Sequence, residues 1–419
     1  MTPEEAEARL LSLELFGMRF GLDRMRRLMT ALGHPERTFA SIHVVGTNGK
    51  SSTTRMIAAI LGRHGYRTGT YLSPHLVSFC ERIRVGDADI TPDRFAAALA
   101  RSLAAAELVN RGGEDRVTQF EALTAAAYSE LSAAGVDVAV IEAGLGGRWD
   151  ATNVIPSTVT VLTGVGLEHT RWLGPTITAI ATEKLDVLQP GSVLVLGPGM
   201  HPEAVAVAEA TASARDAEIV RADGDPHAAV GALGAFQRRN FSVARTAVAA
   251  FLAVTGAGEI DADAAAAAAA DIRVPGRLQR VGESPLTLLD GAHNPDGIAA
   301  LAESLPDLQG RRARRVAVIS ILDDKDAAGM LARLSPHFDE VILTASHNPR
   351  VLPPPTLASL LAQVDGPPSE IVADPRAALA RARELAGPAG FVLATGSIYL
   401  IADLLSPGRA AAGRRRSNL

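Results

Sequence analysis

The sequence lacks several features that mark particular classes of protein. It has a single cysteine, Cys80, which excludes an internal disulfide and is typical of chains that work in a reducing compartment. It has no uninterrupted apolar run of about 18 residues, the length that spans a bilayer. Its first residues show no basic stretch followed by an apolar core, so we expect no secretory signal. The net charge of −5 gives no whole-chain bias toward nucleic acid or anionic membranes. We therefore expect a cytoplasmic protein without nucleic-acid or membrane partners.

Lysine is the scarcest charged residue. Lys50, Lys184 and Lys325 are the only lysines among 41 basic residues, and the rest are arginines. A compact ammonium on a flexible stem does work that a planar guanidinium cannot do. Chance survival could explain any one of the three. All three fall in polar segments that we expect to be loop-like, beside strands or helices, and this favours a chemical role.

What the sequence does contain is an alternation of short β-branched runs with longer helical patterns. This alternation predicts an α/β fold with a mostly parallel sheet, and 419 residues are enough for two domains. We place the boundary at Pro275-Gly276, after an alanine-rich helix over 261–271. The predicted domains are 1–275 and 276–407, followed by a basic, disordered tail over 408–419. The predicted strands are Ile42–Val45, Val136–Ile141, Thr158–Thr163, Val193–Leu196, Leu286–Leu289, Arg315–Ile319, Val341–Thr344 and Phe391–Ala394.

The segment Gly46–Ser51 joins a predicted strand to a predicted helix over 50–62. A glycine-rich loop in this setting binds phosphate through its backbone N–H groups and the helix N-terminus. The full Walker spacing is not met, because its first glycine would fall at Val44. We nevertheless favour a nucleotide loop over an ordinary turn, because Gly49-Lys50-Ser51 is intact and both flanking elements are present.

Two further strand ends of the first domain carry polar residues. Glu142 ends one strand and precedes Gly144, Gly146 and Gly147, and His169 follows the next strand. Ligands bind at the carboxyl ends of strands in open α/β sheets, and a carboxylate there can hold Mg²⁺ together with phosphate and water. Taken alone, Glu142 could equally be a solvated strand end, and His169 an ordinary loop histidine.

Two weaker signals lie farther along the chain. The amides of Gln237 and Asn240, neighbours on one predicted helix, could read the edge of an adenine base, although polar side chains that simply face solvent would explain them as well. In the second domain, Asp290 and His293 follow the first strand and place a carboxylate and an imidazole at its carboxyl end.

Together these segments resemble the ATP-dependent amide ligases of the Mur ligase superfamily, and most closely the folylpolyglutamate synthase and dihydrofolate synthase family. The resemblance runs from Phe16 to about Leu404. Each motif is weak by itself, and the ordered set is specific. The motifs that carry it are Phe16-Gly17-Met18, Gly21–Arg24, Gly46–Ser51, Ser73–Leu76, Glu142–Arg148, Asp150–Asn153, His169-Thr170, Trp172–Gly174, Glu183-Lys184, Pro275–Arg277, Asp290–Pro295 and Thr395–Ser397.

The resemblance implies a P-loop-containing, Mur-ligase-like ATPase domain followed by a smaller Rossmann-like α/β domain. It implies that Ser73, Glu142 and His169 ligate magnesium and that Lys184 carries a carbamate. It places Asn240, Arg277 and Asp290 on the nucleotide and His293 near the incoming amino acid, although Phe236 stands where the family usually has histidine. It also implies that the phosphates of ATP are held by Gly46, Thr47, Asn48, Gly49, Lys50, Ser51 and Ser52.

The implied reaction uses ATP and Mg²⁺ to join L-glutamate to a folate-type carboxylate, of dihydropteroate, tetrahydrofolate or both, through an acyl phosphate. We expect a monomer. One alternative is a Mur-type ligase for a peptidoglycan precursor, which the folate-type opening before Gly46 and the lack of a third domain disfavour. The other is a non-catalytic nucleotide-binding paralogue, which we would expect to have lost Glu142, His169 or Lys184.

Overall fold

The computed structural model describes residues 1–13, 21–111, 116–224, 228–310 and 313–407. The chain forms two compact units. The first contains Met1–Val230 and Arg238–Ile272, and the second contains Gly231–Gln237 and the chain from Arg273 onward. The sequence pattern did not indicate that 231–237 groups with the later unit. The predicted tail, 408–419, and the motif Phe16-Gly17-Met18 lie outside the described residues.

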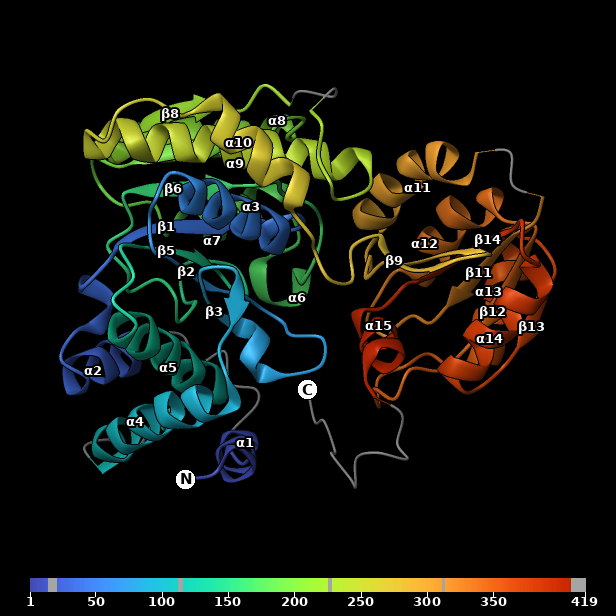
Figure 1. Ribbon diagram of the computed structural model, residues 1–419, viewed down its shortest axis with the longest axis horizontal. Helices are drawn as coiled ribbons and strands as arrows, with labels where there is room; N and C mark the ends of the chain where they lie inside the picture. Colours follow the sequence, from blue (N-terminus) through green and yellow to red (C-terminus); the bar gives the residue numbers. More distant parts are fainter. Residues whose placement is uncertain (14–20, 112–115, 225–227, 311–312, 408–419) are drawn as a thin grey trace. The chain divides into compact units, whose positions relative to one another are not determined.

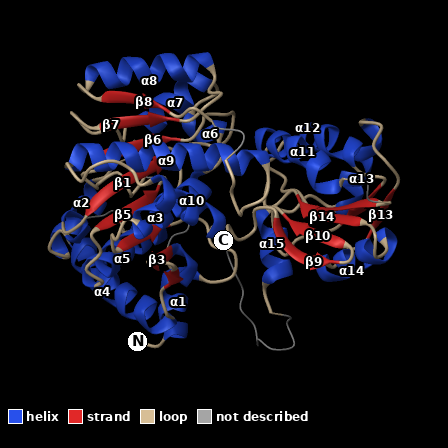
Figure 2. Cartoon of the chain, turned by 45° about the horizontal axis from the view of Figure 1, so that its top comes forward, coloured by secondary structure: helices blue, strands red, loops and turns tan. Residues whose placement is uncertain are grey.

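The first unit is built on an eight-stranded sheet in the order β4-β3-β2-β5-β1-β6-β7-β8 (Figures 1 and 2). Neighbouring strands from β2 to β8 run parallel, whereas β3 is antiparallel to both β2 and β4. The strands are β1 (Ala40–Val45), β2 (Thr68–Tyr71), β3 (Ile83–Val85), β4 (Ala88–Asp89), β5 (Val138–Glu142), β6 (Val159–Leu162), β7 (Val193–Leu196) and β8 (Glu218–Arg221).

Helices cover this sheet. Helix α3 packs against β1, β2 and β5 and carries α10, while α4 and α5 pack on each other and α5 also contacts β2 and β3. The α-helices are α1 (Pro3–Leu11), α2 (Asp23–Ala31), α3 (Lys50–Arg63), α4 (Pro92–Arg111), α5 (Gln119–Ala133), α6 (Thr170–Leu173), α7 (Ile177–Leu185), α8 (Pro202–Ala214), α9 (Ala235–Thr255) and α10 (Ala262–Asp271). Two 3₁₀ turns, η1 (Pro35–Arg37) and η2 (Phe79–Arg82), complete the unit.

The central strands are buried on both faces. Every residue of β5 is buried, as is every residue of β1 after Ala40, which is what parallel strands covered by helices require. Side chains from β2, β5, α4 and α5, among them Tyr71, Ile141 and Tyr128, form one core. Among the described helices, none combines the length and apolar character needed to cross a membrane.

The second unit has a six-stranded sheet in the order β13-β12-β11-β14-β10-β9, and only β9 is antiparallel to its neighbour. Its strands are β9 (Gln279–Glu283), β10 (Leu286–Leu289), β11 (Arg315–Ile319), β12 (Glu340–Leu343), β13 (Ser369–Ile371) and β14 (Phe391–Thr395). Its helices are α11 (Pro295–Gln309), α12 (Ala327–Leu334), α13 (Pro354–Gln363), α14 (Pro375–Ala386) and α15 (Ile398–Leu405), with the 3₁₀ turn η3 (Ser335–His337). The α/β class predicted from the sequence is confirmed in both units.

The strand order of the first unit brings three loops to one edge of the sheet. Strand β1 lies between β5 and β6, with Val44 paired to Glu142 and Val45 paired to Leu162. The carboxyl ends of these three parallel strands therefore lie side by side. The loops that follow them begin at Gly46, Ala143 and Thr163, and they carry the predicted phosphate loop, the glycine-rich turn and the segment of His169.

Candidate active site

The loop between β1 and α3 depends on two glycines. Gly46 has φ +150°, and a Cβ there would lie 2.0 Å from Oγ1 of Thr163. Gly49 has φ +86°, and a Cβ there would lie 2.6 Å from Oδ1 of Asn240. Both backbone conformations are rare for residues with a side chain. The loop is thus pressed between the end of β6 and Asn240, and α3 begins at Lys50 without a side-chain cap. Uncapped N–H groups at a helix start are a ready anion site.

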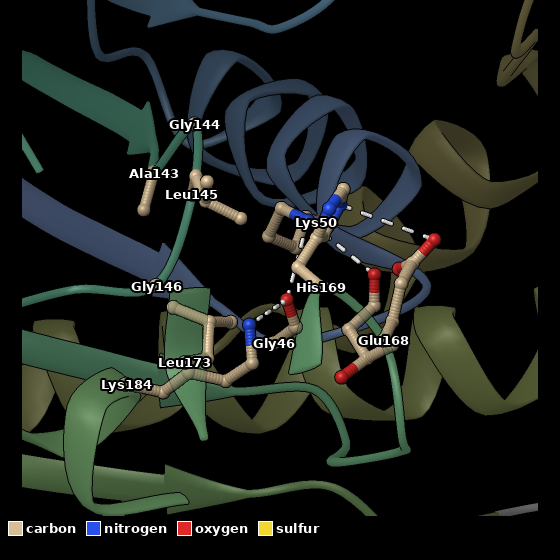
Figure 3. Close-up of a pocket in the computed structure, with 11 residues that line it drawn as sticks. Gly46, Lys50, Ala143, Gly144, Leu145, Gly146, Glu168, His169, Leu173 and Lys184 are labelled. Carbon is tan, nitrogen blue, oxygen red and sulfur yellow. Dashed lines mark hydrogen bonds and ion pairs between the residues drawn. The ribbon is translucent and has the colours of Figure 1, made fainter. Parts of the chain in front are cut away.

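Lys50 and Lys184 meet at one carbonyl oxygen. The Nζ of Lys50 donates to Gly46 O at 3.2 Å and to Thr47 O at 3.4 Å, and the Nζ of Lys184 donates to Gly46 O at 2.9 Å (Figure 3). The sequence separates these lysines by more than a hundred residues. The structure places two of the three lysines side by side at the predicted phosphate loop.

Lys184 is almost fully buried, with 4% of its surface exposed. It lies near the end of helix α7, which corrects our expectation that all three lysines occupy loop-like segments. Burial, and secondarily the positive charge of Lys50, lower the pKa of Lys184 from 10.5 to about 7, although Glu168 and Asp150 act in the opposite direction. A substantial fraction of this amine is therefore neutral near pH 7.

The glycine-rich turn after β5 holds the end of α7 in place. A Cβ at Gly147 would lie 2.6 Å from the carbonyl oxygen of Lys184 and 2.7 Å from that of Glu183, so only glycine fits this approach. The backbone N–H of Arg148 donates to Glu183 O at 2.8 Å. The Arg148 side chain also pairs with Glu183 at 3.3 Å and with Asp186 at 3.4 Å. These contacts fix Lys184 relative to the turn.

Glu142 joins the phosphate loop to the loop that follows β2. It is the last residue of β5 and is 1% exposed. Its Oε1 accepts from Oγ of Ser51 at 2.8 Å, and its Oε2 accepts from the backbone N–H of Ser73 at 3.2 Å. The predicted residues Ser51, Ser73 and Glu142 are therefore in direct contact.

His169 borders the same cavity as the two lysines. It has φ +53° and precedes α6, and 40% of its side chain is exposed. Its Nε2 lies 4.0 Å from Oε1 of Glu168. The cavity is small and opens to solvent. Its lining residues, of which ten are labelled in Figure 3, are Gly46, Thr47, Lys50, Ala143, Gly144, Leu145, Gly146, Glu168, His169, Leu173 and Lys184.

The predicted metal ligands offer one carboxylate, one hydroxyl and one imidazole. Within the described part of the chain, no three His, Cys, Asp or Glu side chains lie close enough together to hold a metal ion by themselves. Mg²⁺ is commonly bound through one or two carboxylates, with phosphate and water supplying the remaining oxygens. A buried carboxylate beside the predicted phosphate loop fits that pattern. Glu142, held by Ser51 and by the backbone of Ser73, is the residue best placed to bind the ion.

In the second unit, Asp290 directs both carboxylate oxygens at the backbone. Its Oδ2 accepts from Leu278 N at 2.9 Å and its Oδ1 from Ala292 N at 2.8 Å. Burial raises the pKa of Asp290, while the positive charge of Arg277 and these two N–H groups limit the rise. The Nδ1 of His293 donates a hydrogen bond to Gly291 O at 2.8 Å. Arg277, Asp290 and His293 thus form one cluster within this unit.

Sequence reasoning missed Thr163 and passed over the side chain of Thr47. The Oγ1 of Thr163 donates to Asn48 O at 2.7 Å, and the Oγ1 of Thr47 accepts from Gly166 N at 3.0 Å. Both bonds tie the phosphate loop to the segment after β6. The signal that could have found Thr163 is its place at the end of a strand next to β1.

Comparisons with known proteins fit this geometry. The family model described as "Mur ligase, glutamate ligase domain" matches residues 276–398. The chain is 35% identical to the dihydrofolate synthase/folylpolyglutamate synthase of Mycobacterium tuberculosis, over 87% of this chain and 84% of that protein. It is 32% identical to the Bacillus subtilis protein of the same name, over 93% and 95%.

Solved structures agree with the sequence relatives. The M. tuberculosis folylpolyglutamate synthase complexed with ADP superposes with a TM-score of 0.88 and 32% identity, covering 99% of both chains. The E. coli FolC in complex with DHPP and ADP superposes with a TM-score of 0.84 and 29% identity, covering 97% of both chains. The Mur-ligase-like two-domain fold is thereby confirmed, and the chain is an ATP-dependent ligase. It belongs to the dihydrofolate synthase/folylpolyglutamate synthase family.

Proposed function

We propose that this chain joins L-glutamate to the carboxylate of a folate-type acceptor, accepting dihydropteroate, reduced folates or both. The observation that carries the proposal is the convergence of Lys50 and Lys184 on the carbonyl of Gly46, inside a phosphate loop. Relatives named for both synthase activities support the choice of acceptor. They also favour this reading over a peptidoglycan-precursor ligase or an inactive paralogue.

The first unit would bind ATP. Backbone N–H groups of Gly46, Thr47, Asn48 and Gly49 would hold the phosphates, together with the hydroxyls of Ser51 and Ser52. The ammonium of Lys50 would exchange its two carbonyl contacts for the γ-phosphate and neutralise charge during transfer. Glu142, Ser73 and His169 would hold Mg²⁺, which when bound offsets negative charge on the phosphates.

Lys184 would act after conversion to a carbamate. The ammonium first loses one proton to solvent. The neutral amine nitrogen then attacks the carbon of CO₂, an N–C bond forms as one C–O π bond opens to a carboxylate oxygen, and a second proton leaves to solvent, so that the cation becomes a carboxylate. The lowered pKa of Lys184 supports this step because only the neutral amine reacts. The carbamate nitrogen keeps one N–H that can still donate to Gly46 O. An arginine at this position would stay protonated and could not react.

Catalysis would then proceed in two transfers. An oxygen of the acceptor carboxylate attacks the γ-phosphorus of ATP, giving an acyl phosphate and ADP. The amine of L-glutamate next attacks the acyl carbon, phosphate leaves, and the amine loses a proton as the amide forms. Asn240, Arg277 and Asp290 would contact the nucleotide and His293 the incoming amino acid. We further propose that the enzyme is a cytoplasmic monomer.

A phosphate-release assay tests the proposal. Purified enzyme is supplied with ATP, Mg²⁺, L-glutamate and one acceptor at a time, dihydropteroate or tetrahydrofolate, and product is identified by mass spectrometry. Glutamate-dependent phosphate release with at least one acceptor is expected. Phosphate release that never depends on glutamate or acceptor would contradict it.

The Glu142→Gln variant tests the metal site. The amide preserves shape and removes the charge, so we expect the half-saturating Mg²⁺ concentration to rise about tenfold. An unchanged magnesium dependence would show that Glu142 is only a buried strand end.

A further inference from the structure

The loop that follows β2 and carries Ser73 is organised around one carboxylate. Glu81 accepts three consecutive backbone N–H groups, from Leu76 at 2.9 Å, Val77 at 2.8 Å and Ser78 at 2.7 Å. Oε1 takes the last two and Oε2 takes the first. One side chain thus fixes three successive peptide units of this loop.

A capping role accounts for only part of this arrangement. Ser78 precedes the 3₁₀ turn η2, and the bond from its N–H to Glu81 belongs to a capping box. The bonds from Leu76 and Val77 lie outside that motif. They extend the hold of Glu81 back along the loop, toward Ser73.

The base of the loop is closed as well. Tyr71 pairs with Ile83 across the antiparallel β2–β3 ladder, and the N–H of Leu72 donates to Arg82 O at 2.8 Å. Inside the loop, Nε of Arg82 donates to Nδ1 of the buried His75 at 2.9 Å. Ser73 therefore lies between Leu72, whose N–H is bonded to Arg82 O, and the segment 75–78, which is held by hydrogen bonds to Glu81 and Arg82.

The loop meets the candidate metal site at Ser73. The N–H of Ser73 donates to Oε2 of Glu142 at 3.2 Å. Displacing Ser73 would remove its hydroxyl from the proposed site and would break a hydrogen bond that orients the Glu142 carboxylate. Groups that orient metal ligands commonly affect metal affinity by ten- to a hundredfold.

We propose that Glu81 is a positioning residue for the magnesium site, because it gathers the N–H groups of Leu76, Val77 and Ser78 and so holds Ser73 against Glu142. The inference rests on the proposed function, in which Ser73 and Glu142 bind the ion. It adds a residue that touches neither the ion nor a substrate.

The direct test is amide hydrogen exchange in the enzyme without nucleotide. In Glu81→Ala the amides of residues 76–78 lose their acceptor, so both a positioning role and a local capping role predict that these amides exchange faster. The amide of Ser73 is the informative one, because its acceptor, Glu142, is untouched. Positioning predicts faster exchange at Ser73, whereas a merely local cap leaves it unchanged. Thermal unfolding followed by circular dichroism checks that each variant folds.

Magnesium dependence supplies the second readout. We expect Glu81→Ala to raise the half-saturating Mg²⁺ concentration about tenfold, with a smaller change in kcat at saturating Mg²⁺. Glu81→Gln retains one carbonyl oxygen, which can still accept from Val77 and Ser78, and should fall between Glu81→Ala and the unmodified enzyme.

A purely electrostatic role makes different predictions. Glu81→Asp keeps the charge but is too short to reach all three N–H groups, so positioning predicts a defect and electrostatics predicts none. Asp89→Asn is the matched charge control, since Asp89 pairs with Arg84 on the neighbouring hairpin. It should behave like the unmodified enzyme.

Two outcomes distinguish a failure of the proposed role of Glu81 from a failure of the proposed metal site. Unaltered Ser73 exchange and unaltered magnesium dependence in folded Glu81→Ala and Glu81→Asp would overturn the role of Glu81. An unaltered magnesium dependence in Glu142→Gln would instead overturn the proposed metal site on which that role depends.

Discussion

Lys184 of the first unit and Asp290 of the second are both buried ionisable groups, 4% and 2% exposed, and their surroundings differ. Asp290 has a backbone N–H donor for each carboxylate oxygen, and both bonds shape the chain around Arg277 and Ala292. Lys184 donates to one carbonyl, which it shares with a second cation, Lys50. Burial moves both pKa values toward the neutral form. The difference indicates that backbone donors fix the orientation of the Asp290 carboxylate, whereas Lys184 is left in a state suited to reaction.

The largest effect on activity should come from replacing Lys50, the cation that shares the Gly46 carbonyl with Lys184. Lys50→Arg keeps the charge, but the broad guanidinium cannot take the place of the compact ammonium that contacts the carbonyl oxygens of Gly46 and Thr47. We expect kcat/KM to fall about a thousandfold, the upper range for loss of one transition-state contact. Steady-state kinetics measure this, with Arg63→Lys on the exposed end of α3 as the control. Near-normal turnover by Lys50→Arg would refute the phosphate-loop assignment.

Lys184→Arg should cost about a hundredfold in kcat, the scale of a lost charge-stabilising group. A guanidinium cannot shed its proton or form a carbamate, so the variant should also be less stable. Lys184→Ala leaves space, and added formate or acetate should restore part of its activity. Electron density at Lys184 in crystals grown above pH 7 provides the structural check. An active arginine variant together with a bare ammonium would end the carbamate hypothesis.

The same lysine should make stability depend on pH. Its pKa is about 7 folded and 10.5 unfolded. Between these values the unfolded chain binds more protons, so stability rises with pH over that window and stays flat below it. We expect a gain of roughly 2 to 3 kcal/mol from pH 7 to pH 9.5 in CO₂-free buffer. Urea unfolding of Lys184→Met, which has no titrating amine, should lack that gain. Identical pH profiles for the two proteins would contradict the lowered pKa.

The smallest effect is expected in the second unit. Asp290→Asn turns one acceptor oxygen into an NH₂ group that faces a backbone N–H, which costs about 1 to 2 kcal/mol. The free energy of unfolding from urea titration measures this loss. A loss of activity larger than the loss of stability explains would support the proposed contact of Asp290 with the nucleotide, whereas equal losses would contradict that contact.

Patterns with a strong local signal were predictable from the sequence. Strands Val193–Leu196, Leu286–Leu289 and Arg315–Ile319 have the predicted bounds, since buried parallel strands are continuous apolar runs. The glycine-rich loop between β1 and α3 was also predictable, because glycines between a strand and a helix are informative locally, and its binding of phosphate stays a prediction.

Short or exposed strands were not predictable. Strands β4 and β8 carry exposed residues, and β3 and β13 have only three residues each, so their patterns are weak. The contacts of the site depend on tertiary structure. Neither the burial of Lys184 in α7 nor the three bonds to Glu81 follows from spacing along the chain. The resemblance supplied residue roles, and the structure supplied the contacts among them.

Helix α9 limits how this protein can be divided. Its first residues, Ala235–Gln237, group with the second unit and the remainder with the first. Leu233 and Phe236 pack against the core of the second unit. A fragment that stops at residue 275 would keep these apolar side chains and lose the core they cover, leaving a surface prone to aggregation. Expression of either unit by itself therefore requires redesign of 231–237, because a single cut in the chain does not separate the two.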